Sequence, residues 1–194
     1  MKLTSIASGS SGNCVFVSSE KTKLLVDVGI SAKRIETGLL ELGETAKNLS
    51  GILITHEHID HINGLGVMMR RYKLPAFATV GTIDSMRKSG KLGEVDKNLF
   101  YAVKEDETFQ IDDILIDPST IWHDAADPVC YSFYSGGVKA SIATDLGNFD
   151  EYLEEMFDAL ENHKDNKSKH CKDLLEGTTV VSFSVNRTEL NHCI

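Results

Sequence analysis

The sequence lacks features that would point to several classes of protein. No apolar run approaches the roughly 20 residues of a membrane-spanning helix, and the N-terminal MKLTSIASGS has no signal-peptide core. The four cysteines form no C-x-x-C pair. Lys and Arg number 20 against 29 Asp and Glu, a formal net charge of −9, which argues against a broad cationic surface but allows a local cationic site. We expect a cytoplasmic, reduced protein without membrane contact.

Length and composition fit a single globular domain. The 194 residues are 41% hydrophobic and 25% charged, which is enough to bury one core. We expect residues 1–162 to form that core and residues 163–194 to be a divergent C-terminal segment of the same domain. The sequence does not indicate the oligomeric state.

The predicted elements alternate between strands and helices. The first 30 residues read as a β-meander, and Ile35, Leu39 and Leu42 share a helical face ahead of Gly43. The apolar run GILIT then predicts a buried strand. Further helices are predicted at 66–73, 82–90 and 150–161, and further strands at 76–80, 113–117, 119–123, 129–135, 139–145 and 178–185. Two strand blocks with helices between them predict two sheets with helices outside.

The segment THEHIDH, which follows the GILI run, concentrates potential metal ligands. Alternate side chains of an extended chain share a side, so His56 and His58 fall together while Glu57 points away. Asp60 and His61 follow where the chain turns into a helix, and they form a second ligand pair. Imidazole and carboxylate groups without thiolates favour a catalytic zinc, manganese or iron site.

Two further ligands are expected at later strand ends. His123 follows the apolar run STIW, and Asp145 follows the alternating stretch ASIAT. Taken singly, each would more often cap a strand or a turn. Taken with THEHIDH, they indicate ligands that converge from separate loops.

These motifs resemble the metallo-β-lactamase fold superfamily. Its pattern is H-x-H-x-D-H, then a histidine and an aspartate that each follow a strand. The stretches SGSSGNCVFV, LLVDVGIS, HDAADPV and ATDLG look like its YycJ/WalJ branch, which is related to the nucleases tRNase Z and RNase J. The resemblance implies an α/β fold, the four-layer αββα sandwich, with a shortened last part. It also implies an exonuclease-like hydrolase of phosphodiester bonds in DNA or RNA.

The resemblance assigns two divalent ions, zinc, manganese or iron, to six ligands: His56, His58 and His123 for the first, Asp60 and His61 for the second, and Asp145 between them. Two such ions activate a water as the nucleophile and stabilise the attacking and leaving oxygens on phosphorus. Asp60 and His61 would carry the catalytic step, with Asp60 as proton acceptor. Asp27 would orient a histidine from behind.

The loop SGSSGN offers polar groups near the first predicted turn. We expect Ser10, Ser11 and Asn13 to face a substrate phosphate, although this composition also suits an ordinary hairpin connection.

The chain departs from the family pattern after Gly147. The resemblance places a late histidine on the second ion, whereas His163, His170 and His192 stand in no matching context. Two alternatives therefore stay open beside the nuclease. One is a hydrolase of small esters or thioesters, and the other is a catalytically weak metal-binding protein that acts through a partner.

Overall fold

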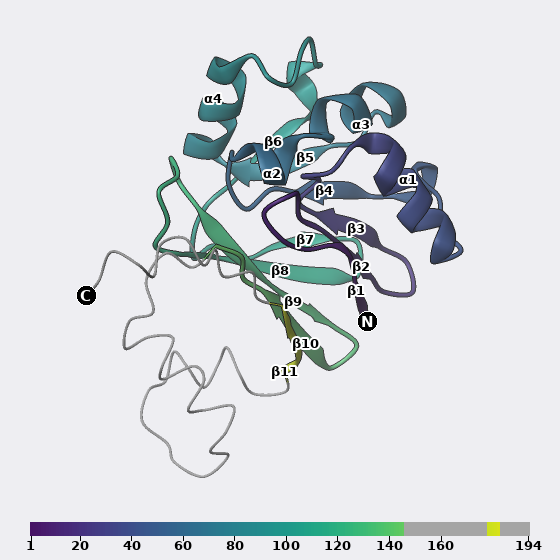
Figure 1. The fold of residues 1–194 in the computed structure, drawn as a ribbon. Coiled ribbons are helices and arrows are strands. Elements are labelled where there is room, and N and C mark those ends of the chain that lie inside the picture. The colour runs from purple at the N-terminus through teal and green to yellow at the C-terminus, as the bar shows by residue number, and fades with distance from the viewer. Residues whose placement is uncertain (146–177, 183–194) are drawn as a thin grey trace, which may run out of the picture.

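A computed structural model describes residues 1–145 and 178–182, which form two β-sheets packed face to face (Figure 1). The first sheet has six strands in chain order: β1 (Lys2–Ala7), β2 (Cys14–Ser18), β3 (Lys23–Val26), β4 (Gly51–Leu53), β5 (Ala76–Thr79) and β6 (Phe100–Val103). The second sheet has the order β11-β10-β9-β8-β7 and consists, within the described residues, of β7 (Phe109–Ile111), β8 (Ile114–Thr120), β9 (Val129–Ser135), β10 (Val138–Ile142) and β11 (Thr178–Ser182).

The described helices lie on the face of the first sheet that points away from the second (Figure 1). They are α1 (Ala32–Glu41), α2 (Ile59–Ile62), α3 (Leu65–Tyr72) and α4 (Val80–Ser89), together with the 3-10 turns η1 (Ala46–Asn48) and η2 (Lys97–Leu99). A buried apolar cluster packs these helices on the first sheet, and a second cluster fills the space between the sheets. The protein thus has a helix layer and two sheet layers in its described part.

The first sheet changes from antiparallel to parallel at β3. The strands β1 to β3 form the meander, whereas β3, β4, β5 and β6 pair in parallel because a helical crossover separates each from the next. The carboxyl ends of these parallel strands therefore meet at one edge, where sites of α/β proteins commonly lie.

Strand ends of the second sheet lie at the same edge. Because β8, β9 and β10 are antiparallel, the end of β8, the start of β9 and the end of β10 lie together. The amide of Val129 donates to the carbonyl oxygen of Thr55 at 3.0 Å. The hydroxyl of the buried Tyr131 donates to the carbonyl oxygen of Ile54 at 2.9 Å. These bonds join the start of β9 to the chain leaving β4.

Most sequence expectations for the described residues are confirmed. The meander, the helix ahead of Gly43, the GILIT strand and the strand after Gly177 all form. The helix ahead of Gly43 begins at Ser31, whose hydroxyl accepts a hydrogen bond from Arg34 N. Leu42 was expected on the buried face, but it lies at the helix end and is 39% exposed.

The expected strands 113–117 and 119–123 are wrong as separate elements. One strand, β8, spans Ile114–Thr120 and includes Pro118. Because β7 pairs with β8 only from Ile114 to Ile116, the missing N–H of Pro118 interrupts no second ladder. The chain leaves the sheet at Ile121, so His123 lies on a loop rather than at a strand end.

Two other boundaries differ from the expectation. The chain was expected to turn into a helix at Asp60 and His61, but the short helix α2 already begins at Ile59, so both are helical residues. The strand predicted at 139–145 ends at Ile142, which leaves Asp145 in the loop beyond. The helix expected at 150–161 and the late histidines lie outside the described residues, and the division at residue 162 stays a prediction.

Candidate metal centre

Four loops meet at the shared edge of the two sheets. They follow β3, β4, β8 and β10, and they carry Asp27, the THEHIDH segment, His123 and Asp145. The loop after β3 packs so tightly on the loop after β4 that a methyl group on Gly29 would lie 1.5 Å from the carbonyl oxygen of Asp60. Only glycine fits at this contact, which fixes the position of Asp60.

His56, His58 and His123 form a three-histidine group. Their ring centroids lie 4.6 to 4.8 Å apart, and Nε2 of His123 faces Nδ1 of His58 at 3.1 Å. One ligand atom from each ring lies within 4.8 Å of the others. Two of these rings come from one short segment and the third comes from a loop 65 residues later.

The three-histidine group fits a divalent metal ion by its donor chemistry. Among the described residues, the buried Nε2 of His56 has no hydrogen-bond partner. Leaving a buried polar atom unpaired is unfavourable, and three imidazole nitrogens are a common ligand set for a catalytic metal. Burial, followed by the neighbouring imidazoles of His61, His123 and His58, lowers the pKa of His56 to about 2. His56 is therefore neutral, and its Nε2 is free to bind a metal ion.

Thr55 and Asp27 fix the tautomer of His56. The Thr55 hydroxyl donates to Oδ2 of Asp27 at 2.8 Å, and the same oxygen of Thr55 lies 3.0 Å from Nδ1 of His56. Because a hydroxyl has one proton, Nδ1 of His56 donates to Thr55, and the lone pair stays on Nε2. The orphaned nitrogen is thus the one that a metal ion would need.

Asp60, His61 and Asp145 form a second, mixed group. Nε2 of His61 lies 2.6 Å from Oδ2 of Asp145 and 3.7 Å from Oδ2 of Asp60. The same Asp145 oxygen is 3.7 Å from Nε2 of His56, so Asp145 reaches toward both groups. Of the residues around Asp145, it is His56 and His61 that lie close enough to it for a metal site, with Asp60 further out.

Asp27 holds His61 from the opposite side. Its Oδ2 accepts a hydrogen bond from Nδ1 of His61 at 2.7 Å, and its Oδ1 accepts one from the Thr55 amide at 2.9 Å. Burial alone would lower the pKa of His61, but the charges and hydrogen bonds of Asp27 and Asp145 outweigh burial and raise it to about 10. The two carboxylates therefore favour positive charge at this position, as a proton or as a metal ion.

The SGSSGN loop contributes one side chain to the centre. The buried Asn13 accepts a hydrogen bond from Gly9 N, and its Nδ2 lies 3.1 Å from Nε2 of His61. Ser10 and Ser11 are exposed. A role of these three residues in phosphate binding stays a prediction.

The loop that carries His123 is anchored on two sides. Glu57 accepts a hydrogen bond from Ala126 N at 2.9 Å. The hydroxyls of Thr79 and Thr82 donate to the carbonyl oxygen of Asp127 at 2.7 and 3.1 Å. These contacts hold His123 against the other two rings.

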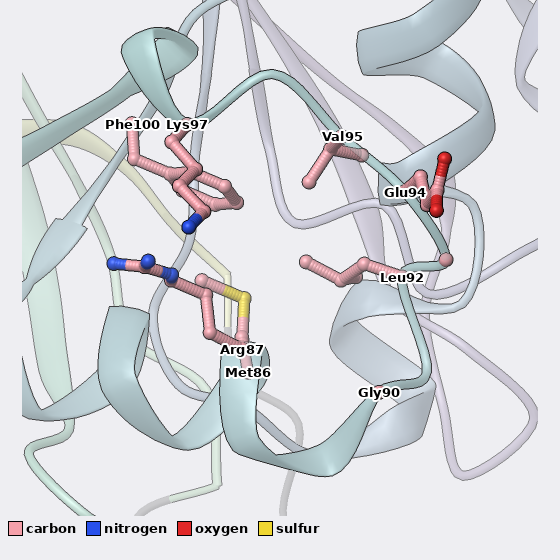
Figure 2. A pocket seen from close by; sticks show the side chains of 9 residues that line it. Met86, Arg87, Gly90, Leu92, Glu94, Val95, Lys97 and Phe100 are labelled. Atoms are coloured by element: carbon pink, nitrogen blue, oxygen red, sulfur yellow. The ribbon is translucent and has the colours of Figure 1, made fainter.

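A pocket of about 430 Å³ lies at the other end of α4 (Figure 2). It is lined by the last turn of α4, the loop that follows and Phe100 at the start of β6. Figure 2 shows the nitrogen atoms of Arg87 and Lys97 on one side and the Glu94 carboxylate on the other. With one carboxylate and no histidine, this pocket has no metal-ligand set.

The residues that sequence reasoning missed are supporting ones. Thr55 and Glu57 belong to the motif segment itself, yet their partners Asp27 and Ala126 are distant in the chain. A polar residue that ends an otherwise apolar run, as Thr55 does after GILI, was the available signal. No comparable signal marked the role of Asp127.

The comparisons with known proteins agree with this architecture. The chain matches the family model of the metallo-beta-lactamase superfamily over residues 7–177. Like the Rm3 metallo-beta-lactamase, it has this fold: the two share 18% identity with a TM-score of 0.63, over 90% of this chain and 67% of that one. Within the described residues, no helix has the length and apolar character needed to cross a membrane.

Two curated relatives are more similar in sequence. Exodeoxyribonuclease YycJ of Bacillus anthracis is 39% identical over 142 residues, which cover 73% of this chain and 53% of that protein. Exodeoxyribonuclease WalJ of Streptococcus pneumoniae is 39% identical over 146 residues, which cover 75% and 54%. The chain thus spans about half the length of the curated relatives it matches.

Proposed function

The chain belongs to the metallo-beta-lactamase superfamily, and from this premise we propose that it is a metal-dependent hydrolase of phosphodiester bonds in nucleic acid, with exonuclease-like action. The observation that carries the proposal is the convergence of two ligand groups that share access to Asp145. The similarity to two relatives named exodeoxyribonucleases supports nucleic acid as substrate.

In this proposal the three-histidine group holds one divalent ion, and the mixed group holds a second. Zinc, manganese or iron suits these nitrogen and oxygen ligands. Such ions supply Lewis acidity, which neutralises charge on the phosphate and lowers the pKa of water. Asp145 would contact both ions, because its carboxylate already reaches toward His56 and His61.

The side chains of the centre would divide the remaining tasks. Asp27 and Thr55 orient His61 and His56 through buried hydrogen bonds. Asp60 is a partly accessible carboxylate of the centre, with 25% of its side chain exposed. It would accept a proton as water attacks phosphorus, the role of a general base.

The charge of the centre makes substrate binding depend on metal. Asp60 and Asp145 carry negative charge at the place where a phosphate must sit, and the chain as a whole has a formal charge of −9. Like charges repel, so the metal-free protein should bind oligonucleotides weakly. Loading with divalent ions reverses the local sign and should restore binding.

A nuclease assay with matched variants tests the proposal. The chain is freed of metal with a chelator, reconstituted with zinc or manganese, and incubated with end-labelled single-stranded and duplex DNA and RNA. We expect release of mononucleotides from an end, and a loss of about 10²- to 10⁴-fold in Asp60→Ala, the usual contribution of a general base. Asp84→Ala, an exposed aspartate on α4, is the control that should keep full activity.

The assay also separates the alternatives. Equal cleavage by Asp60→Ala and wild type would show that another site or a contaminant acts. Hydrolysis of a thioester without cleavage of any polynucleotide would identify a small-molecule hydrolase. Metal binding without any hydrolysis would favour a metal-binding protein that acts through a partner.

A further inference from the structure

The sole tryptophan of the chain is the sequence neighbour of a candidate metal ligand, and its side chain is largely exposed. Trp122 is 79% exposed, and it directly precedes His123. A side chain of this size is usually largely buried, and Trp122 belongs to neither apolar cluster of the core. Packing of the described residues therefore does not account for its position.

The backbone around Trp122 is held in place. Ile121 is buried, and its amide donates to the carbonyl oxygen of Pro128 at 3.2 Å. On the other side, His123 contacts His58 through their ring nitrogens, and Glu57 binds Ala126 N. An indole on an anchored loop loses little conformational freedom when a flat partner stacks on it.

A second apolar side chain flanks the same pair of histidines. Ile59 is 48% exposed and lies between His58 and Asp60. Trp122 and Ile59 are thus each one residue away from the 3.1 Å contact between the rings of His58 and His123. Two of the loops that form the centre thus each carry an exposed apolar side chain that a substrate could contact.

The charges of this rim are unfavourable for a phosphate backbone. The loop from Ile121 to Pro128 carries Asp124 and Asp127 and no Lys or Arg, and the segment from Thr55 to Asn63 likewise has no Lys or Arg. Counterion release through cationic side chains, the usual source of affinity for nucleic acid, is therefore not available from these loops. The uncharged face of a base is the part of the substrate that suits an indole.

On the premise of the proposed function, we propose that Trp122 is a positioning residue: it stacks on a base of the nucleic-acid substrate and thereby holds the neighbouring phosphate at the metal centre. Stacking is tolerant of sequence because every base has a π-face. Binding should accordingly show little preference among bases and only a shallow dependence on salt.

Because Trp122 is the only tryptophan, fluorescence excited at wavelengths that the tyrosines do not absorb reports on it alone. The zinc-loaded protein is titrated with a short single-stranded phosphorothioate oligonucleotide, which resists cleavage, and with the same oligonucleotide carrying abasic sugars at its terminal positions. We expect quenching by the first, and binding of the second that is weaker by at least about 5-fold and leaves the emission unchanged. Equal quenching by both oligonucleotides would overturn the proposal.

Variants give a second, kinetic readout. Trp122→Ala should raise KM for single-stranded DNA by about 5- to 150-fold, the range for removal of a stacking aromatic, with kcat within about twofold of wild type. Trp122→Phe should recover most of the loss. Leu40→Ala, which truncates a 71% exposed leucine on α1, is the matched control and should leave KM unchanged.

The outcomes distinguish this inference from the function on which it rests. If wild type cleaves DNA while Trp122→Ala keeps the wild-type KM, stacking is refuted and the nuclease stands. If natural oligonucleotides quench Trp122 but no polynucleotide is hydrolysed, the base contact stands and the nuclease is refuted. A lower kcat with unchanged KM in Trp122→Ala would instead show that the residue supports His123, which also overturns the proposal.

Discussion

The two halves of the candidate metal centre differ in how the ring nitrogens of their histidines are paired. In the three-histidine group, burial and the neighbouring imidazoles lower the pKa of His56, and its Nε2 has no partner among the described residues. In the mixed group, His61 is hydrogen-bonded on both ring nitrogens, between Asp27 and Asp145. One half therefore offers a free lone pair on His56, whereas the histidine of the other half is already paired on both ring nitrogens.

This difference predicts different behaviour toward metal. An ion that enters the three-histidine group relieves an unpaired buried atom and displaces only the contact between the ring nitrogens of His58 and His123. An ion that enters the mixed group must displace the proton that the two carboxylates favour on His61, since a metal ligand has to be deprotonated. We expect the three-histidine group to bind its ion more tightly than the mixed group.

The largest expected effect is the loss of a ligand from the tighter half. His58→Ala removes a ring nitrogen that faces His123, and a lost ligand should reduce metal affinity by more than the 10- to 100-fold typical of a supporting residue. Titration with a competing chromophoric chelator should show two ions in wild type and loss of the tighter one in His58→Ala.

Asp145→Asn is the variant to compare with His58→Ala. It keeps the shape of the side chain but reduces the charge at the carboxylate near both groups. We expect it to weaken the looser ion first. If His58→Ala and Asp145→Asn impair the same single ion, the division into two halves is wrong.

An intermediate effect is expected for Asp27→Asn. Asp27 is 1% exposed and bonds His61 and Thr55, so its replacement should weaken the ion of the mixed group by about 10- to 100-fold. It should also lower the free energy of unfolding by about 1.5 to 3 kcal/mol, the contribution of a hydrogen bond to a charged group. Chelator competition and urea denaturation measure the two quantities. Greater weakening of the tighter ion than of the looser one would contradict this expectation, because Asp27 bonds His61 directly and reaches His56 only through Thr55.

The sequence predicted which residues meet at the candidate centre better than it predicted the geometry that brings them together. H-x-H-x-D-H is local, and the extended chain places His56 and His58 on one side whatever the surroundings. The position of His123 depends on where β8 ends, and Pro118 inside an apolar stretch obscured that end. Asp145 depends in the same way on where β10 stops.

The supporting contacts were beyond sequence reasoning because they are long-range hydrogen bonds. Thr55 to Asp27 spans 28 residues, and Glu57 to Ala126 spans 69. Asp27 and Thr55 become neighbours only when β3 and β4 pair, and Glu57 and Ala126 only when the two sheets meet at one edge. No periodicity encodes either contact. The spacing of residues along one segment predicts which side chains lie on the same side. It does not predict which distant loop packs against them.

The smallest expected effect tests how the loop of His123 is held. Glu57→Ala removes the acceptor for Ala126 N, whereas Glu57→Gln keeps an oxygen there and serves as the control. The loss of one hydrogen bond should lower the free energy of unfolding by about 0.5 to 1.5 kcal/mol. Because the loop has a second anchor at Asp127, the tighter ion should weaken only modestly, and the looser ion should not change. A selective loss of the tighter ion in Glu57→Ala, with Glu57→Gln at the wild-type value, would show that the second half of the site is independent of this loop. Loss of both ions would instead show that both halves of the site depend on Glu57.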